Sequence, residues 1–195
     1  MEGDTVTTET TTSNEQESLP KMLHTLASNW PFAKHILNFG CGDFPELTKE
    51  SLTNYHNQVM TVTKYDPSNK EDEAVVTDIN MIDRKVCRFD VLLCDDVLNA
   101  SKDLDATLLD LQRVDFDTAV IHIDEGNGSG KARKVRNAYQ RNMLVADYMP
   151  KVLQYFHLHD VTLHRSHKVI VIAKGKRYYH IDDVNEVDQV VAEAE

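Results

Sequence analysis

The segment HILNFGCGDF (residues 35–44) is followed, after one short intervening stretch, by VMTVTKYDP (residues 59–67). An apolar run that ends at closely spaced glycines predicts a buried strand and then a tight turn. Pro45 suits the first turn of a helix, and the second segment alternates like a strand before it reaches Asp66. We therefore expect a βαβ unit with a carboxylate after its second strand, which is the layout of a nucleoside-binding site.

The glycine spacing separates two classes of cofactor site. A dinucleotide-binding turn has the pattern G-x-G-x-x-G, and Pro45 occupies the place of its third glycine here. The turn instead resembles motif I of class I S-adenosylmethionine (SAM)-dependent methyltransferases. The resemblance implies that Asp66 accepts hydrogen bonds from both ribose hydroxyls, because a carboxylate is an acceptor. It also implies that the other contacts to the cofactor from this turn come from Asn38, Gly40, Cys41 and Gly42.

Two positions depart from the family pattern. An acidic residue usually stands two places before the first glycine, and a third glycine stands two places after the second. Asn38 and Phe44 occupy these positions here. Asn38 can still orient the turn or accept from the ammonium group of the ligand, with less charge. The alternative is that Gly40 and Gly42 only shape a turn in some other α/β domain.

The run AVVTD (residues 74–78) predicts a third short strand, which is followed by Ile79. In the family that the sequence resembles, an acidic and an apolar residue at this place contact the adenine. Asp78 would accept from the exocyclic amine, and Ile79 would pack on the ring. An Asp at the end of a strand is also a common cap of a helix or turn, so that interpretation stays open.

The run FDVLLC (residues 89–94) predicts a buried strand, and an acidic pair follows it directly. Ligands of open α/β sheets bind at the carboxyl ends of the strands, so these polar groups should face the site. The resemblance implies that Asp95, Asp96 and Asn99 are the catalytic or substrate-orienting residues. The Asp/Asn-Pro-Pro-aromatic tetrapeptide of the branch that methylates nucleic-acid amines is absent, which weakens the case for a DNA base amine as acceptor.

Residues 102–114 predict an amphipathic helix and residues 118–123 a further buried strand. Residues 126–146 then begin Gly-Asn-Gly-Ser-Gly and contain five basic residues but no Asp or Glu. We expect a mobile basic loop that engages nucleic acid or another anionic substrate. The alternative is a solvated loop with no ligand. The candidate substrate-binding residues are Lys131, Arg133, Lys134 and Arg136.

Two strands are expected at residues 160–164 and 168–173, and their short connection forces an antiparallel pair. The sheet of class I methyltransferases ends in such a hairpin. We therefore predict a doubly wound, Rossmann-like α/β fold with seven strands, the last one antiparallel. This domain spans residues 18–178. Residues 1–17 are expected to form a disordered acidic tail, and residues 179–195 an acidic tail or short helix.

The net charge of −11 is concentrated at the two ends of the chain. Residues 1–20 and 182–195 together contain eleven of the 32 acidic residues and no Lys or Arg. The other 21 acidic residues lie between these two ends, where they balance all 21 Lys and Arg residues. The acidic composition is therefore a weak argument against binding to nucleic acid.

Three cysteines without a C-x-x-C pair favour reduced thiols, and we expect a soluble cytoplasmic protein without a membrane span. No metal site is expected, because the spacing of the four histidines between residues 157 and 167 fits no standard zinc pattern. The oligomeric state is open. GCGDF, YDP and the YQRN segment (residues 139–142) are together similar to small methyltransferase-like proteins of bacteriophages, which would place the protein in a host cytoplasm.

These patterns predict a SAM-dependent methyltransferase with SAM as its cofactor. The competing hypothesis is a non-catalytic SAM-binding or protein-interaction accessory factor of the phage type that keeps the fold. An enzyme that degrades SAM on the same fold is a third possibility. Neither the methyl acceptor nor the methylated atom follows from the sequence.

Overall fold

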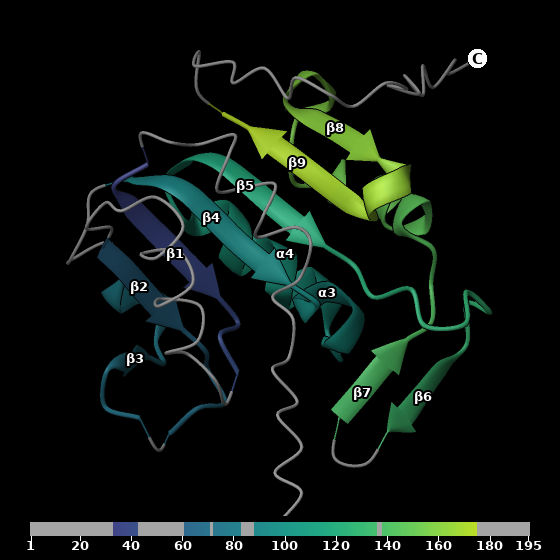
Figure 1. Cartoon of the computed structure of the whole chain (residues 1–195), viewed down its shortest axis with the longest axis horizontal. Coiled ribbons are helices and arrows are strands. Elements are labelled where there is room, and N and C mark those ends of the chain that lie inside the picture. Colours follow the sequence, from purple (N-terminus) through teal and green to yellow (C-terminus); the bar gives the residue numbers. More distant parts are fainter. Residues whose placement is uncertain (1–32, 43–60, 71, 83–87, 136–137, 175–195) are drawn as a thin grey trace, which may run out of the picture.

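The computed structural model describes residues 33–42, 61–70, 72–82, 88–135 and 138–174. A seven-stranded main sheet runs in the order β3-β2-β1-β4-β5-β9-β8 (Figure 1). Strands β1 to β5 are parallel, and β9 pairs antiparallel with both β5 and β8. The strands are β1 (His35–Phe39), β2 (Thr61–Tyr65), β3 (Val75–Val76), β4 (Phe89–Asp95), β5 (Phe116–His122), β8 (Val161–His164) and β9 (Val169–Ala173). The predicted seven-stranded sheet with an antiparallel last strand is confirmed.

Alternation along the strands builds a core on each face of the main sheet. Leu37 and Leu92 belong to the larger cluster, whereas their neighbours Ile36 and Val91 belong to the smaller one. Because successive side chains of a strand point to opposite faces, both faces of the central strands are apolar, as expected for a parallel sheet.

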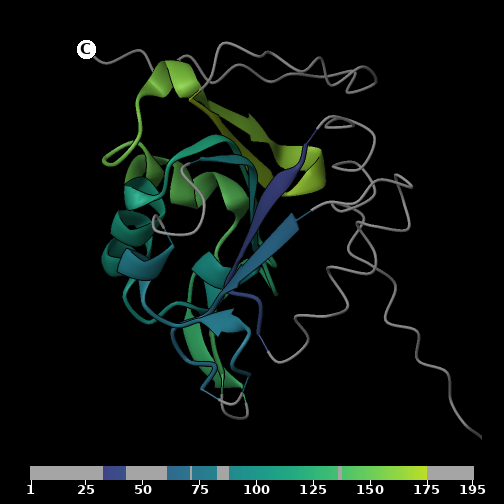
Figure 2. The same ribbon diagram turned by 90° about the vertical axis from the view of Figure 1, so that its left-hand side faces the viewer.

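Helix α4 (Leu104–Arg113) covers one face of the main sheet (Figure 2). Its buried residues belong to the larger cluster. Asp103 caps this helix by accepting a hydrogen bond from the Ala106 N–H, and Leu108 and Leu111 are buried. The amphipathic helix predicted for residues 102–114 is therefore present. The other described helices are short: α3 (Val97–Ala100), α5 (Met149–Val152) and the 3-10 helices η1 (Ile79–Met81), η2 (Val145–Tyr148), η3 (Leu158–Asp160) and η4 (Arg165–His167).

The basic segment differs from the predicted loop. Residues 126–146 contain a β-hairpin, formed by β6 (Ala132–Val135) and β7 (Ala138–Arg141), which lies apart from the main sheet (Figure 1). The sequence did not indicate strands here, because the segment lacks the apolar alternation of a core strand. The third strand is also shorter than predicted and covers only Val75–Val76.

Several predictions concern residues outside the described ranges. These include the helix start at Pro45, the tails at residues 1–17 and 179–195, and the role of Arg136. Within the described residues, no helix has the length and the apolar composition needed to cross a bilayer.

Candidate functional site

The glycine turn after β1 is tied to the end of β2. Gly40 N–H donates to the Tyr65 carbonyl over 2.7 Å, and Gly42 N–H donates to Asp66 Oδ2 over 3.0 Å. Asp66 is only 8% exposed, and its Oδ1 accepts from the Ser68 N–H and hydroxyl at 2.8 and 2.5 Å. Asn69 Nδ2 donates to the Gly42 carbonyl as well. The predicted βα turn and the predicted ribose carboxylate therefore form one connected unit.

The two glycines of this turn have different structural roles. Both have positive φ angles, +77° at Gly40 and +62° at Gly42, which favour glycine. A Cβ atom on Gly40 would lie 2.3 Å from Val97 Cγ2, so this glycine lets the turn pack against the start of α3. A Cβ atom on Gly42 would meet no atom of the described residues within 4 Å. Gly42 is therefore not packed against that part of the chain as Gly40 is.

Asn38 and Cys41 flank this turn. Asn38 is buried near the end of β1 and lies opposite Lys64 in the β1–β2 register. Cys41 is half-buried, and burial together with the negative charge of Asp66 raises its pKa to about 11. Its thiol is therefore protonated at neutral pH, and it is a poor nucleophile there.

Asp78 caps the short helix η1. Its Oδ1 accepts from both the backbone N–H and the side-chain amide of Asn80, at 2.9 and 2.8 Å. This is the capping role that the sequence left open. Ile79 is half-buried and packs against the larger core cluster. Asp78 is exposed, so its capping contact does not prevent its other oxygen from accepting a ligand.

Asp95 and Asp96 converge on a residue that the sequence did not single out. Asp95 and His122 are directly opposite in the β4–β5 register. His122 Nδ1 lies 2.9 Å from Asp95 Oδ1 and 3.0 Å from Asp96 Oδ1. Burial lowers the pKa of His122, but its hydrogen bonds to both carboxylates and their charges raise that pKa to about 9. The imidazole is therefore protonated at neutral pH in this structure.

The backbone of Asp96 is in the left-handed region, at φ +57° and ψ +15°, which is uncommon for a residue other than glycine. Its N–H donates to the His122 carbonyl, and its Oδ1 accepts from the Asp124 N–H over 2.7 Å. These two contacts join the end of β4 to the end of β5. They hold the Asp96 carboxylate beside His122.

Asn99 lies on α3 and differs from the acidic pair in its environment. It is 3% exposed, and its Oδ1 has no hydrogen-bond partner within the described residues. The sequence placed Asn99 with the two aspartates because all three follow the core of β4. The structure shows a buried amide rather than a solvent-facing group.

The basic candidates lie on the hairpin and the turn before it rather than in an irregular loop. Lys131, Arg133 and Lys134 are exposed, and Arg136 lies outside the described residues. Because side chains alternate along a strand, Arg133 and Lys134 belong to opposite faces of the hairpin. Lys134 shares its face with Tyr139, its register partner.

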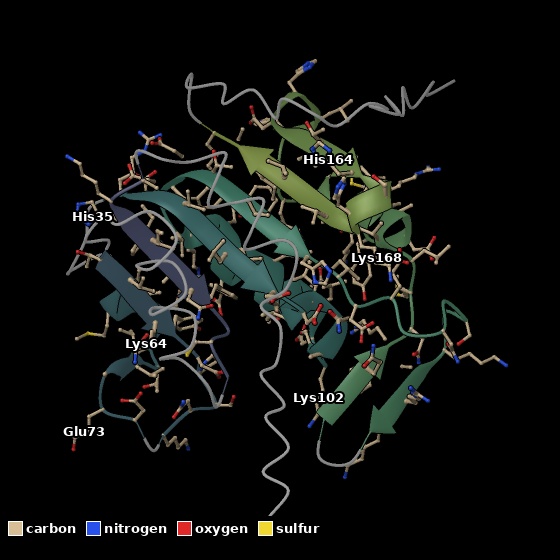
Figure 3. The ribbon with its side chains drawn as sticks, viewed as in Figure 1. His35, Lys64, Glu73, Lys102, His164 and Lys168 are labelled. Atoms are coloured by element: carbon tan, nitrogen blue, oxygen red, sulfur yellow. The ribbon has the colours of Figure 1, made fainter. Side chains whose placement is uncertain are left out.

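The hairpin is fixed to the domain at its base. Arg141 donates to the carbonyls of Ser101 and Lys102, so β7 is held against the end of α3. Asn142 is 1% exposed and donates through Nδ2 to the Lys131 carbonyl over 2.7 Å. Figure 3 shows Lys102 beside the hairpin and Lys168 near the start of β9.

His122 is the site residue that sequence reasoning missed. It stands in the run TAVIHI (residues 118–123), which is typical of a buried strand. The only signal in the sequence was the alternation of that strand, which places His122 on the face opposite to Ala119 and Ile121. The β4–β5 register is what brings it to Asp95.

Comparisons with known proteins give structural similarity alone. No protein-family model and no curated protein sequence matches this chain. The N-terminal domain of EvdMO1 with SAH bound is similar in structure, with 16% identity, a TM-score of 0.48 and coverage of 78% of both chains. An rRNA methylase from Escherichia coli has 12% identity and a TM-score of 0.46 over 80% of this chain and 63% of that one.

A third similar structure is the plantazolicin methyltransferase BamL in complex with a triazolic desmethylPZN analog and SAH. It has 16% identity and a TM-score of 0.47 over 74% of this chain and 64% of that one. All three TM-scores are below 0.5. The strand order of the main sheet, with β9 antiparallel between β5 and β8, is what defines the class I methyltransferase fold of this chain.

Proposed function

We propose that this protein is a SAM-dependent methyltransferase that binds SAM at the carboxyl edge of β1 and β2. The observation that carries the proposal is the position of the Asp66 carboxylate, 3.0 Å from the Gly42 N–H. Strand β1 lies between β2 and β4. From β1 the chain builds the sheet outward first through β2 and β3 on one side, and then through β4 and β5 on the other. Open α/β sheets bind ligands at such a switch point.

The hydrogen bonds of Asp66 are compatible with a ribose. A carboxylate oxygen has two acceptor positions, and Asp66 Oδ2 accepts from Gly42 N–H alone among the contacts of the described residues. One position on Oδ2 is thus available to a hydroxyl. A second hydroxyl would take the place of the Ser68 hydroxyl on Oδ1. Within the described residues no side chain packs on the Gly42 Cα, which is compatible with the approach of a ligand to the backbone.

The proposed binding position of the methyl acceptor is beside Asp95 and Asp96. SAM, when bound, supplies a methyl group on a positively charged sulfur, and the reaction needs an acceptor held close to and in line with it. The carboxylates can orient an acceptor hydroxyl or amine and take up its proton. Cys41 is not assigned a covalent role, because its raised pKa keeps the thiol protonated.

The acceptor is proposed to be nucleic acid or another anionic molecule. The support is the exposed basic side chains of the β6–β7 hairpin and of the turn before it, Lys131, Arg133 and Lys134. The hairpin is anchored to the end of α3 through Arg141. Helix α3 directly follows the Asp95–Asp96 pair. Phosphate groups bound by the hairpin would therefore lie on the side of the molecule that carries the candidate catalytic residues.

Isothermal titration calorimetry with SAM and with SAH tests this proposal. We compare the full chain with Asp66→Asn and with a matched control, Asp90→Asn. Asp90 also accepts from two backbone N–H groups, those of Lys34 and His35, but it does so at the amino end of β1. We expect saturable binding in the wild type and in Asp90→Asn, and at least a roughly tenfold weaker Kd in Asp66→Asn, equivalent to about 1.4 kcal/mol. Absence of binding to both ligands would overturn the proposal.

The second candidate function is a non-catalytic SAM-binding or protein-interaction factor, for example a phage accessory protein. The observation that favours it is that Asp66 already accepts one hydrogen bond from Gly42 and two from Ser68, while Asn38 replaces the usual acidic residue. Transfer of a radiolabelled methyl group to nucleic-acid or protein substrates separates the candidates. SAM binding without any transfer favours the accessory factor.

A further inference from the structure

Three potential metal ligands meet at the carboxyl ends of β4 and β5. They come from Asp95, Asp96 and His122, each of which offers one ligand atom, and these atoms lie within 4.8 Å of one another. The sequence predicted no metal site, and the histidines considered in that prediction, between residues 157 and 167, do not belong to this group. The group became visible only through the β4–β5 register.

The two distances from His122 Nδ1 to the carboxylates match the edges of an octahedral coordination shell. With metal–ligand bonds of about 2.1 Å, adjacent ligands of an octahedron are about 3.0 Å apart, whereas those of a tetrahedron are about 3.4 Å apart. The two distances from Nδ1 are 2.9 and 3.0 Å. A cation that replaces the Nδ1 proton can therefore lie at bonding distance from the nitrogen and from either carboxylate.

The charges of the three side chains also favour a divalent cation. Two carboxylates face one ring nitrogen, and that nitrogen can carry a single proton that points well at only one oxygen at a time. A divalent cation on the neutral ring would balance both carboxylates and contact all three ligand atoms.

The ligands are held in place before any ion binds. Asp95 and His122 are fixed by strand pairing, and the Asp124 N–H orients the Asp96 carboxylate. Hydrogen bonds of this kind to a ligand raise metal affinity, because the ligand loses less freedom on binding. The side chains of His122, Asp95 and Asp96 are 22%, 29% and 48% exposed, so water or a substrate oxygen can complete the shell.

We propose that Asp95, Asp96 and His122 bind one divalent first-row transition cation of the Mn²⁺ type in octahedral geometry. Carboxylates suit Mn²⁺, and the imidazole adds a nitrogen ligand that Mg²⁺ and Ca²⁺ rarely use. The ion would leave positions open for an oxygen-donor substrate beside the candidate SAM site. Metal binding is measured in the absence of SAM. A negative result would therefore overturn the metal site without bearing on the proposed binding of SAM.

Titration of the full-length protein with MnCl₂, with free Mn²⁺ followed by electron paramagnetic resonance, tests the proposal. We expect one saturable site. Asp95→Asn and Asp96→Asn should each raise its Kd by at least about tenfold. Asn resembles Asp in shape and tolerates the left-handed backbone of residue 96, so both variants should fold. The control Asp90→Asn, at the opposite end of β4, should bind as the wild type does.

A second measurement needs no variant and distinguishes this site from weak binding by the acidic ends of the chain. In ¹⁵N-labelled wild-type protein, substoichiometric Mn²⁺ should first broaden the amide signals of residues 95–97 and 122–124. The proposal is overturned if no saturable site exists. It is equally overturned if both aspartate variants bind with wild-type affinity, or if broadening begins elsewhere.

Discussion

His122 and Asp95 are direct partners in the parallel β4–β5 register, and His122 Nδ1 lies 2.9 Å from Asp95 Oδ1. Asp96 contributes a second carboxylate at 3.0 Å from the same nitrogen. The ends of two central strands are thus joined by a charged contact at the edge where ligands of this fold bind. The stability of the metal-free protein should depend on this contact.

In metal-free protein, we expect the contribution of His122 to stability to decrease at alkaline pH. Its pKa in the folded state, about 9, lies above the ordinary value of 6.5. The stabilisation is therefore fully present below about pH 6.5 and is lost as the pH rises through about 9. Urea unfolding of the wild type and of His122→Gln in the presence of EDTA measures this contribution. The wild type should exceed the variant in free energy of unfolding by more at about pH 6 than at about pH 9.5. An equal difference in free energy at the two pH values would contradict the raised pKa of His122.

Substitution of the two glycines of the β1 turn should destabilise the fold to different extents. Gly40→Ala places a Cβ 2.3 Å from Val97 Cγ2 in addition to the strain of its φ angle, so we expect a loss of about 2–4 kcal/mol. Gly42→Ala meets no atom of the described residues, so we expect the backbone strain alone, about 1–2 kcal/mol. Urea denaturation measures both losses. Val97→Ala should rescue part of the Gly40→Ala loss and none of the Gly42→Ala loss.

Asn142 should be essential for the base of the β6–β7 hairpin. Its side-chain amide donates to the Lys131 carbonyl over 2.7 Å from a position that is 1% exposed. Asn142→Ala removes this buried bond, at a cost of about 1–3 kcal/mol. Hydrogen exchange should show faster exchange of the hairpin amides in this variant. Exchange in β4 and β5 serves as the internal reference, and uniform acceleration across both regions would argue for a global effect instead.

If the acceptor is a nucleic acid, charge removal on the hairpin should weaken binding in a salt-dependent way. Lys134→Gln and Arg133→Gln each remove one exposed cation, and removal of one phosphate-binding charge should reduce the slope of log K against log salt by about 0.7–0.9. Fluorescence anisotropy with labelled RNA and DNA measures this slope. Lys34→Gln removes an exposed cation at the amino end of β1 and should leave the slope unchanged. Equal effects of all three variants would indicate nonspecific attraction.

Local sequence patterns were sufficient for the main sheet. Apolar runs predicted β1, β4 and β5 close to their observed bounds, and the three-residue link at residues 165–167 predicted the antiparallel pair β8–β9. The prediction was wrong for the basic segment, because exposed strands that pair only with each other lack the apolar alternation of a core strand. The sequence thus identified elements that bury apolar side chains, and it missed the β6–β7 hairpin.

The sequence by itself determined which strands follow one another along the chain, the glycine turn after β1, and the acidic pair at the end of β4. These follow from spacing along the chain, where burial and turn formation act over a few residues. Only the tertiary structure decided that Asp95 faces His122, that Gly40 packs on Val97 and that Arg133 and Lys134 lie on opposite faces of a hairpin. Strand register sets these relationships, because a shift by one residue would turn each side chain to the other face of the sheet.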